Sequence, residues 1–224
     1  MRRLILIAVL VMLGGVFACA MAEETSTPPA PPVPDSTSSE VHAEMLGTIN
    51  VTILPPIKVI SVKEKAADFE PDTGYAAGMA GSGMAYQSMM TDGFGKLFQW
   101  MQAGNHPTGP AMAAFYEDPE KTAAKDLTCK VMFPVGADAK ATGDLMIEDL
   151  PEMQAAVVQY KGPYEGATDV WNAVGKWITD NGYESAGAPM EVYLKSQGDN
   201  VPPSEYLTEI RWPVKKAEKT EPKN

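Results

Sequence analysis

The sequence has little cysteine and little histidine. Its 224 residues include two cysteines, Cys19 and Cys129, and two histidines, His42 and His106. Cys19 lies in the predicted signal peptide or would carry a lipid, so a mature domain would keep one free thiol and form no internal disulfide. No cysteine or histidine has a partner at the spacing of a metal site or catalytic pair. The sequence therefore predicts no metal site and no cofactor, and Cys129 is interpreted as a small buried hydrophobic residue.

Positive charge is also scarce. Lysine and arginine total 18 against 29 aspartates and glutamates, a formal net charge of −11, and the body of the chain has no basic cluster. Proteins that bind nucleic acids usually present a basic face to the phosphate backbone. The composition therefore predicts no nucleic-acid partner, and an acidic domain of this kind would attract cationic or neutral ligands.

One long apolar run lies at the N-terminus. After a short basic start, residues 4–17 are apolar, which is too short for a comfortable membrane span and typical of an export signal. Ala20-Met21-Ala22 is typical of a secretion cleavage site, whereas Val16-Phe17-Ala18-Cys19 resembles a bacterial lipobox that would place a lipid on Cys19. We expect residues 1–22 to be a signal peptide, with an uncleaved anchor as a third alternative. The predicted location is the bacterial envelope, periplasmic or membrane-anchored through Cys19.

Composition divides the rest of the chain into three parts. Residues 23–48 are rich in proline, serine and threonine and cannot bury enough apolar area to fold, so they are predicted to be a linker. Residues 216–224 are charged and are predicted to be a disordered tail. The segment between them, residues 49–215, is predicted to be one folded domain.

Hydrophobic periodicity in this segment predicts an α+β domain. Helices are expected over residues 84–103 and 166–181, where apolar side chains recur at intervals of three and four. Gly93 and Gly95 are expected to weaken the first helix. Strands are expected around the first helix over residues 57–62, 112–116 and 127–135. Around the second helix they are expected over residues 153–160, 190–194 and 206–214.

Three pairs of segments point to an internal repeat. The members of each pair are separated by nearly the same number of residues. The pairs are Trp100 with Trp177, Ala114-Phe115-Tyr116 with Glu191-Val192-Tyr193, and Phe133-Pro134-Val135 with Trp212-Pro213-Val214. One unit alone would leave its sheet half-covered, whereas two units can bury the shared surface. The sequence therefore predicts duplicated β-α-β-β units, related by a pseudo-twofold axis, with a ligand groove between the halves.

Alternation along the last two strands suggests which side chains line the groove. Glu209 and Arg211 share one face of their strand, and Glu191 and Tyr193 share one face of theirs. We expect the helices to cover Ile210, Val192 and Leu194, which leaves Glu209, Glu191 and Tyr193 facing the groove. A carboxylate among aromatic rings can bind a flat cation through charge pairing and cation–π attraction. The full set of candidate ligand-binding residues is Glu209, Tyr193, Glu191, Tyr164, Tyr116 and Trp212.

Each candidate also has a structural interpretation. Glu209 could be a solvated strand residue, or be paired with Arg211 or Lys130. The tyrosines and Trp177 could be core aromatic residues with a hydroxyl or ring edge at the surface.

The order of the motifs resembles the GyrI-like (gyrase-inhibitor-like) domains, also called AraC-type effector-binding domains. The motifs are Gly162-Pro163-Tyr164-Glu165, the helix with Trp177, Glu191-Val192-Tyr193-Leu194, and Thr208-Glu209-Ile210 followed by Pro213-Val214. The resemblance covers roughly residues 50–215 and implies a duplicated β-α-β-β fold whose groove binds small molecules, often amphipathic cations. It also implies that the glutamate at the Thr-Glu-Ile position faces the ligand. Some freestanding members are hydrolases that use this glutamate on reactive cyclopropane-bearing compounds.

Three functions are consistent with these observations. The leading prediction is a small-molecule binding domain outside the cytoplasm, a scavenger or sensor of a hydrophobic or cationic ligand. The second is a hydrolase of reactive electrophiles in which Glu209 is the catalytic residue and orients water. The third is a structural envelope protein with a degenerate groove. The resemblance extends to gene regulators, but no helix-turn-helix module precedes the domain here, so the regulator role is not carried over.

Overall fold

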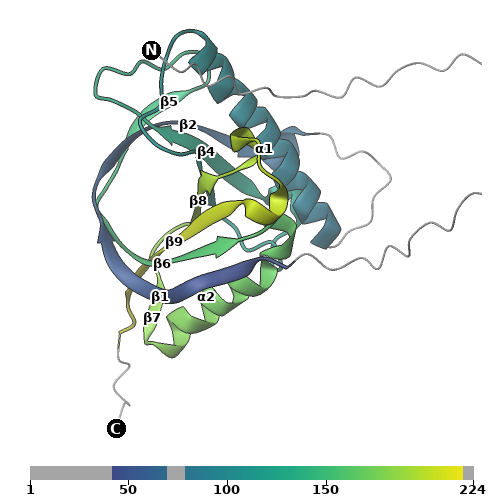
Figure 1. The fold of residues 1–224 in the computed structure, drawn as a ribbon, viewed down its shortest axis with the longest axis vertical. Helices are drawn as coiled ribbons and strands as arrows, with labels where there is room; N and C mark the ends of the chain where they lie inside the picture. The colour runs from purple at the N-terminus through teal and green to yellow at the C-terminus, as the bar shows by residue number, and fades with distance from the viewer. Residues whose placement is uncertain (1–41, 70–78, 219–224) are drawn as a thin grey trace, which may run out of the picture.

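The computed structural model describes residues 42–69 and 79–218, which form an α+β architecture (Figure 1). In this part of the chain, nine strands form one sheet in the order β1-β6-β9-β8-β3-β4-β2-β5, with β7 paired to β9, and all neighbouring strands are antiparallel. The strands are β1 Glu44–Leu54, β2 Ile57–Lys65, β3 Met112–Phe115, β4 Thr128–Pro134, β5 Met146–Leu150, β6 Met153–Lys161, β7 Tyr183–Ser185, β8 Met190–Lys195 and β9 Leu207–Lys216. The helices are α1 Met79–Gln102 and α2 Thr168–Asp180.

Both helices cover the same face of the sheet. Ala113 on β3, Glu191 on β8 and Ile210 on β9 are cross-strand neighbours, so their side chains share one face. Ala113 packs in a cluster with Leu97 of α1, and Ile210 packs in a cluster with Val174 of α2. Figure 1 shows α1 in the upper half of the view, over β2 and β4, and α2 in the lower half, beside β1 and β7. The face that the helices cover is called the helix face below.

A glycine lets α1 approach the sheet closely. A Cβ atom on Gly93 would lie 2.5 Å from Cγ2 of Val131 on β4, a distance that real Cβ atoms do not tolerate. The helix propensity lost at Gly93 is therefore offset by close packing on the helix face. Gly95 is different, because a Cβ there would meet nothing within 4 Å.

The two halves of the sheet follow the same pairing order and exchange one strand each. The first half places β2 beside β4 and β4 beside β3, and the second places β6 beside β9 and β9 beside β8. However, β1 pairs with β6 although it leads directly into β2, and β5 pairs with β2 although it leads directly into β6. Each link is two residues long and contains proline: Pro55-Pro56 and Pro151-Glu152. This order is consistent with a duplication, whereas the pseudo-twofold axis stays a prediction.

The main differences from the sequence predictions lie at the sheet edges. β1 begins at Glu44, inside the segment predicted to be a linker up to residue 48, and β5 and β7 are not predicted at all. β9 extends to Lys216, one residue into the predicted tail. The predicted signal peptide and most of the predicted linker lie outside the described residues. In the ranges that the structure describes, neither helix has the apolar length needed to cross a membrane.

Candidate ligand-binding site

The centre of the helix face holds a buried carboxylate. Glu191 on β8 has only 6% of its surface exposed. The Tyr160 hydroxyl and the Trp171 indole N–H both donate hydrogen bonds to Glu191 Oε1, at 2.8 and 3.2 Å. The Tyr193 hydroxyl donates to Oε2 at 2.9 Å. Strands β6 and β8 and helix α2 thus direct three neutral donors at one carboxylate, and among the described residues Glu191 forms no ion pair.

Burial decides the protonation behaviour of this group. Desolvation raises the pKa of Glu191 above its ordinary value of 4.5, although the hydrogen bonds from Tyr160, Tyr193 and Trp171 lower it in part. Desolvation and the nearby Glu191 charge raise the pKa of Tyr193 well above its ordinary 10.0. The tyrosine hydroxyls therefore stay protonated and remain hydrogen-bond donors, while the carboxyl group is available to change charge.

Aromatic rings from both halves surround this carboxylate. Tyr193 contacts Phe94 of α1 edge-on, with ring centroids 6.1 Å apart, and contacts Tyr164 with centroids 5.4 Å apart. Trp171 of α2 meets Phe115 of β3 edge-on at 6.1 Å and Trp212 of β9 at 5.8 Å. We call Glu191 with its three donors and these rings the aromatic cage; its rings are Phe94, Phe115, Tyr160, Tyr164, Trp171, Tyr193 and Trp212. Most of its outer rings are only partly buried, so they form the rim of the cage.

The expectation that Glu209 shares a face with Glu191 and Tyr193 is wrong. Glu209 pairs across strands with Val192, whereas Glu191 pairs with Ile210. The side chains of Glu209 and Val192 therefore lie on the opposite face of the sheet, away from the helices. Val192 packs there in a second apolar cluster with Met112 and Met132, rather than under the helices as expected.

The surroundings of Glu209 are polar and partly exposed. Its side chain is 14% exposed, and its Oε1 atom accepts a hydrogen bond from Arg211 Nε at 2.7 Å. Gln159 Nε2 donates to the Oε2 atom at 3.0 Å. A shallow cavity of about 280 Å³ lies beside Glu209 and Gln159, where the register of β1 shifts after Leu46. Of the two pairings considered for Glu209, the structure has Arg211, since Lys130 pairs with Glu148 at 2.8 Å.

Tyr116 lies apart from the cage as well. It is 42% exposed, and Lys63 Nζ lies 4.0 Å from the centre of its ring. The repeat aligns Tyr116 with Tyr193, but Phe115, one residue earlier, is the side chain on the helix face. The predicted alignment of the two halves is thus off by one residue at this strand, and Tyr116 lies on the other side of the sheet. Of the six candidate residues, the cage brings together Glu191, Tyr193, Tyr164 and Trp212.

Comparison with known proteins agrees with this architecture. The family model described as the GyrI-like small molecule binding domain matches residues 49–215. The chain is a member of the GyrI-like family. No curated protein sequence matches it significantly.

Solved structures share the GyrI-like fold with this chain. The C-terminal domain of EcmrR is 20% identical, with a TM-score of 0.58 over 80% of this chain and 99% of that domain. EcmrR in its complex with DNA has a TM-score of 0.60 and 20% identity over 76% of this chain, which spans 58% of the EcmrR chain. A hydrolase from Listeria innocua has a TM-score of 0.51 and 11% identity, over 75% of this chain and 91% of that one.

Sequence reasoning missed three side chains of the aromatic cage. Tyr160 was part of a predicted strand, Trp171 of a predicted helix, and Phe115 of a repeat pair, but none was a candidate site residue. The sequence did offer one signal for these residues, which is the aromatic content of the two helix–strand units. Trp171, for example, lies one residue after the buried Val170 on α2. Only the pairing of Ala113 with Glu191, and of Thr208 with both Tyr160 and Tyr193, brings these residues together.

Proposed function

We propose that this GyrI-like domain binds a flat, hydrophobic organic cation in the aromatic cage, with Glu191 as the charge partner. The observation that carries the proposal is a buried carboxylate whose hydrogen-bond partners in the described part of the chain are all neutral donors. An unpaired charge in a protein interior is costly, and its energy falls when an opposite charge arrives. A cationic ligand would supply that charge.

The rings around Glu191 favour the same chemistry. Tyrosine and tryptophan faces attract cations most strongly where water is excluded. Edge-on contacts of Trp171 with Phe115 and of Tyr193 with Phe94 offer ring faces and edges from both helices and the sheet. A flat aromatic ligand can bury its apolar area against these rings while its positive centre approaches the Glu191 oxygens.

The substitution Glu191→Gln tests this proposal. It keeps the shape and one hydrogen-bond acceptor and removes the charge. We expect the affinity for N-methyl-4-phenylpyridinium to fall roughly ten- to a hundredfold, which corresponds to about 1–3 kcal/mol. Affinity for the neutral analogue 4-phenylpyridine, measured at pH 8 by calorimetry, should change little. Equal losses for the cation and the neutral analogue, or no loss for either, would contradict a charge-paired site.

A second candidate function rests on Glu209. Its carboxylate is fixed by Gln159 and Arg211 beside a cavity, as a residue that orients water would need to be. Hydrolysis of a reactive electrophile at this position predicts that Glu209→Gln abolishes turnover of a cyclopropane-bearing substrate while Glu191→Gln leaves it intact. Turnover that survives Glu209→Gln would exclude the hydrolase function at this residue.

The proposed place of action is outside the cytoplasm. The support is the sequence of residues 1–22, which has the basic start, apolar run and cleavage motif of an export signal. Intact mass of the protein from the native envelope tests this proposal. A mature chain that begins at a lipid-modified Cys19 indicates tethering, one that begins at Glu23 indicates secretion, and an unprocessed Met1 contradicts both.

A further inference from the structure

A buried hydroxyl without a hydrogen bond lies on the floor of the aromatic cage. Thr208 on β9 has none of its surface exposed. Among the described residues, its Oγ1 atom is the one buried side-chain oxygen or nitrogen that has no hydrogen-bond partner. Such a hydroxyl has given up its hydrogen bonds to water and gained none in return. A valine has nearly the same shape and would avoid that cost, so the threonine at this position requires an explanation.

The sheet places this hydroxyl beside the polar centre of the cage. Thr208 is the cross-strand neighbour of Tyr160 on β6 and of Tyr193 on β8, so the three side chains share the helix face. Both tyrosines donate their hydroxyl protons to Glu191. Burial raises the pKa of Tyr160, and the nearby Thr208 hydroxyl opposes part of this rise, although the two groups do not meet hydrogen-bond geometry. Thr208 therefore lies next to the Glu191 network without belonging to it.

The positions of the cage that remain open are hydrogen-bond acceptors. An ionised carboxylate offers about four acceptor positions on its two oxygens. Oε1 of Glu191 accepts from Tyr160 and Trp171. Oε2 accepts from Tyr193, which leaves one of its positions open among the described residues. The protons of all three donors are engaged, whereas the oxygen of Thr208 is open, so a group that completes the cage must bring donors.

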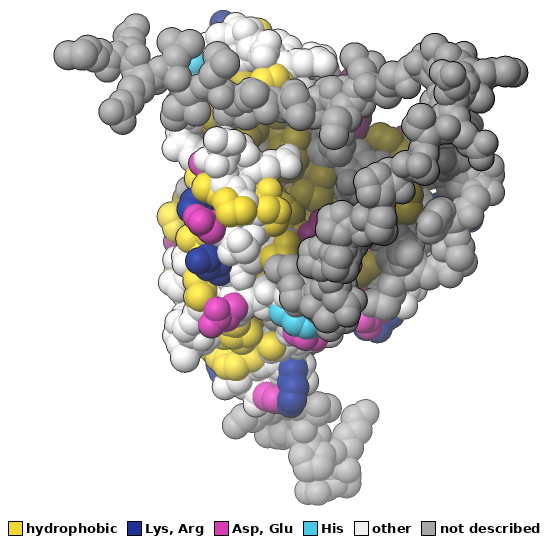
Figure 2. All heavy atoms as spheres, turned by 45° about the vertical axis from the view of Figure 1, so that its right-hand side comes forward, with side chains coloured by type: hydrophobic (Ala, Val, Ile, Leu, Met, Phe, Trp, Pro, Cys, Tyr) yellow, Lys and Arg dark blue, Asp and Glu magenta, His cyan; other side chains and the backbone are white. Residues whose placement is uncertain are grey.

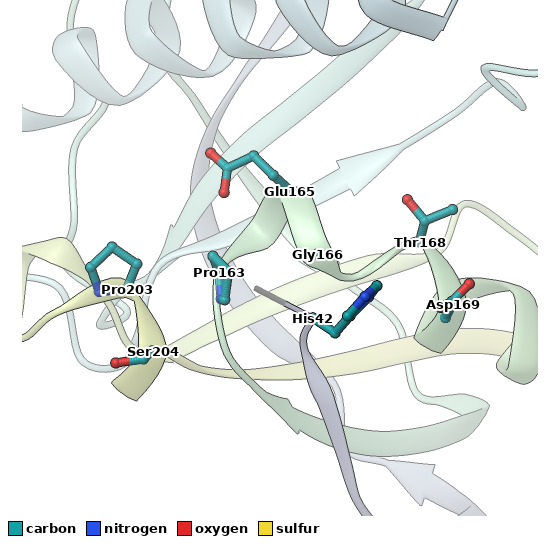
Figure 3. A pocket seen from close by; sticks show the side chains of 8 residues that line it. All are labelled: His42, Pro163, Glu165, Gly166, Thr168, Asp169, Pro203 and Ser204. Atoms are coloured by element: carbon teal, nitrogen blue, oxygen red, sulfur yellow. The ribbon is translucent and has the colours of Figure 1, made fainter. Parts of the chain in front are cut away.

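Two turns beside Thr208 carry stacked rings. Tyr164 begins the turn η3 (Tyr164–Gly166), and Tyr206 follows the turn η5 (Pro203–Glu205) and lies two residues before Thr208. The rings of Tyr164 and Tyr206 stack with centroids 5.1 Å apart. Figure 3 shows residues of both turns around an open surface hollow. Because Thr208 is fully buried, a bound molecule reaches its hydroxyl only after rings such as Tyr164 turn aside.

The rim rings of the aromatic cage offer apolar surface for the rest of such a molecule. They are only partly buried, so an apolar body can pack against them while a polar group reaches the floor of the cage. Figure 2 shows apolar side chains on the described part of one face, among acidic and basic ones.

We propose that Thr208 sets the specificity of the cage by accepting a hydrogen bond from an N–H group of the bound molecule. A second N–H of the same molecule can use the open position on Glu191 Oε2. The cage then selects primary and secondary amines over quaternary ammonium compounds, whose methyl groups would leave Thr208 without a partner. This inference rests on the proposed function for the location of the ligand. The selectivity does not follow from charge, because a protonated amine and a quaternary nitrogen carry the same charge.

Calorimetry with a matched pair of ligands tests this specificity. The pair is 2-naphthylmethylamine, which is protonated at neutral pH, and its N,N,N-trimethyl derivative, which has the same rings and charge but no N–H. In Thr208→Val, affinity for the amine should fall about tenfold, as expected for one lost hydrogen bond, and affinity for the trimethyl compound should change less than about twofold. Thr208→Ser keeps the hydroxyl and should preserve the ratio of the two affinities. Thr52→Val, at an exposed position on β1, is the matched control and should change neither affinity.

Thermal denaturation of the same variants gives a test that needs no ligand. Thr208→Val removes a hydroxyl that has no partner in the protein, so the thermal midpoint should stay the same or rise. A clear fall that Thr208→Ser does not share would show that the hydroxyl already has a partner, and would overturn the inference.

The outcomes separate this inference from the proposed function. An affinity ratio that is unchanged in Thr208→Val, or an equal loss for both ligands, overturns Thr208 as the specificity residue, since packing or a bound water would then explain the effect. Glu191→Gln that leaves both affinities unchanged contradicts the charge pairing, whereas a changed ratio in Thr208→Val still supports the hydrogen bond. If neither ligand binds the unaltered protein, both proposals fail.

Discussion

Two glutamates on adjacent strands show how strongly the surroundings decide what a carboxylate can do. Glu191 on β8 is buried among neutral donors on the helix face. Glu209 on β9 is partly exposed on the opposite face and is paired with Arg211. The first is a charge without a counter-ion, which a cationic ligand can complete. The second already has its counter-ion, so it is better suited to orient a polar group than to attract a cation.

The largest expected effect separates the two residues by stability. Glu191→Leu leaves three donors without an acceptor, two of them buried, and should lower the free energy of unfolding by about 2–4 kcal/mol. Glu209→Leu should cost about 1 kcal/mol or less, because Gln159 and Arg211 are partly exposed and can bind water. Urea denaturation of the two variants measures both values.

A matched variant sharpens this test. Glu191→Gln keeps an acceptor oxygen for Tyr160 or Tyr193 and should be less destabilising than Glu191→Leu. Equal losses for Glu191→Leu and Glu209→Leu would mean that the buried hydrogen bonds contribute no more than the exposed ion pair.

The next effect is on the pH dependence of stability. Because desolvation raises the pKa of Glu191 in the folded state, the folded protein binds this proton more tightly than the unfolded chain does. The stabilisation that the protonated Glu191 contributes is complete at pH values below its ordinary pKa of 4.5. It is lost as the pH rises through the raised pKa of the folded state. Relative to Glu191→Gln, the free energy of unfolding should therefore fall above pH 4.5, by at most about 1.4 kcal/mol per pH unit.

Denaturation curves at a series of pH values check this direction, and cation affinity should rise over the same interval because the ligand requires the ionised carboxylate. The variant Glu209→Gln supplies a reference curve with the same chemical change on the other face. Stability profiles of the unaltered protein and Glu191→Gln that stay parallel would show that burial does not control the proton on Glu191.

The smallest effect concerns the ion pair on the exposed face. Arg211→Ala should lower the free energy of unfolding by less than about 1 kcal/mol, and added salt should reduce the loss further. Thermal or urea denaturation at low and high salt measures this difference. A loss as large as that of Glu191→Leu would show that Glu209 and Arg211 form a structural core of their own.

Periodicity within a segment predicts much of this fold. Both helices and the six predicted strands occur within a few residues of their expected bounds. The buried side of α1 runs through Met89, Leu97 and Trp100, with Gly93 at the closest approach to the sheet. The edge strands β1 and β5 were not recognised, because an edge strand has one neighbour and a weak apolar pattern.

The candidate site was predicted less well, for a geometric reason. Alternation relates Glu209 to Arg211, and Glu191 to Tyr193, because each pair lies on one strand. It does not say whether Glu191 lies opposite Glu209 or opposite Ile210, and a change of one residue in register moves a side chain to the other face. The same limit applies to Tyr116, whose place in the repeat differs by one residue from its place in the sheet.

The exchange of β1 and β5 between the halves also determines how the chain can fold. β1 pairs with β6, which lies about one hundred residues later in the sequence, and β2 and β5 are separated by a similar length of chain. A high contact order of this kind requires the ends of long loops to meet before the sheet gains stability, which slows folding to roughly milliseconds to seconds. Each half contributes the strand that completes the other, so we expect the two halves to unfold together as one cooperative unit.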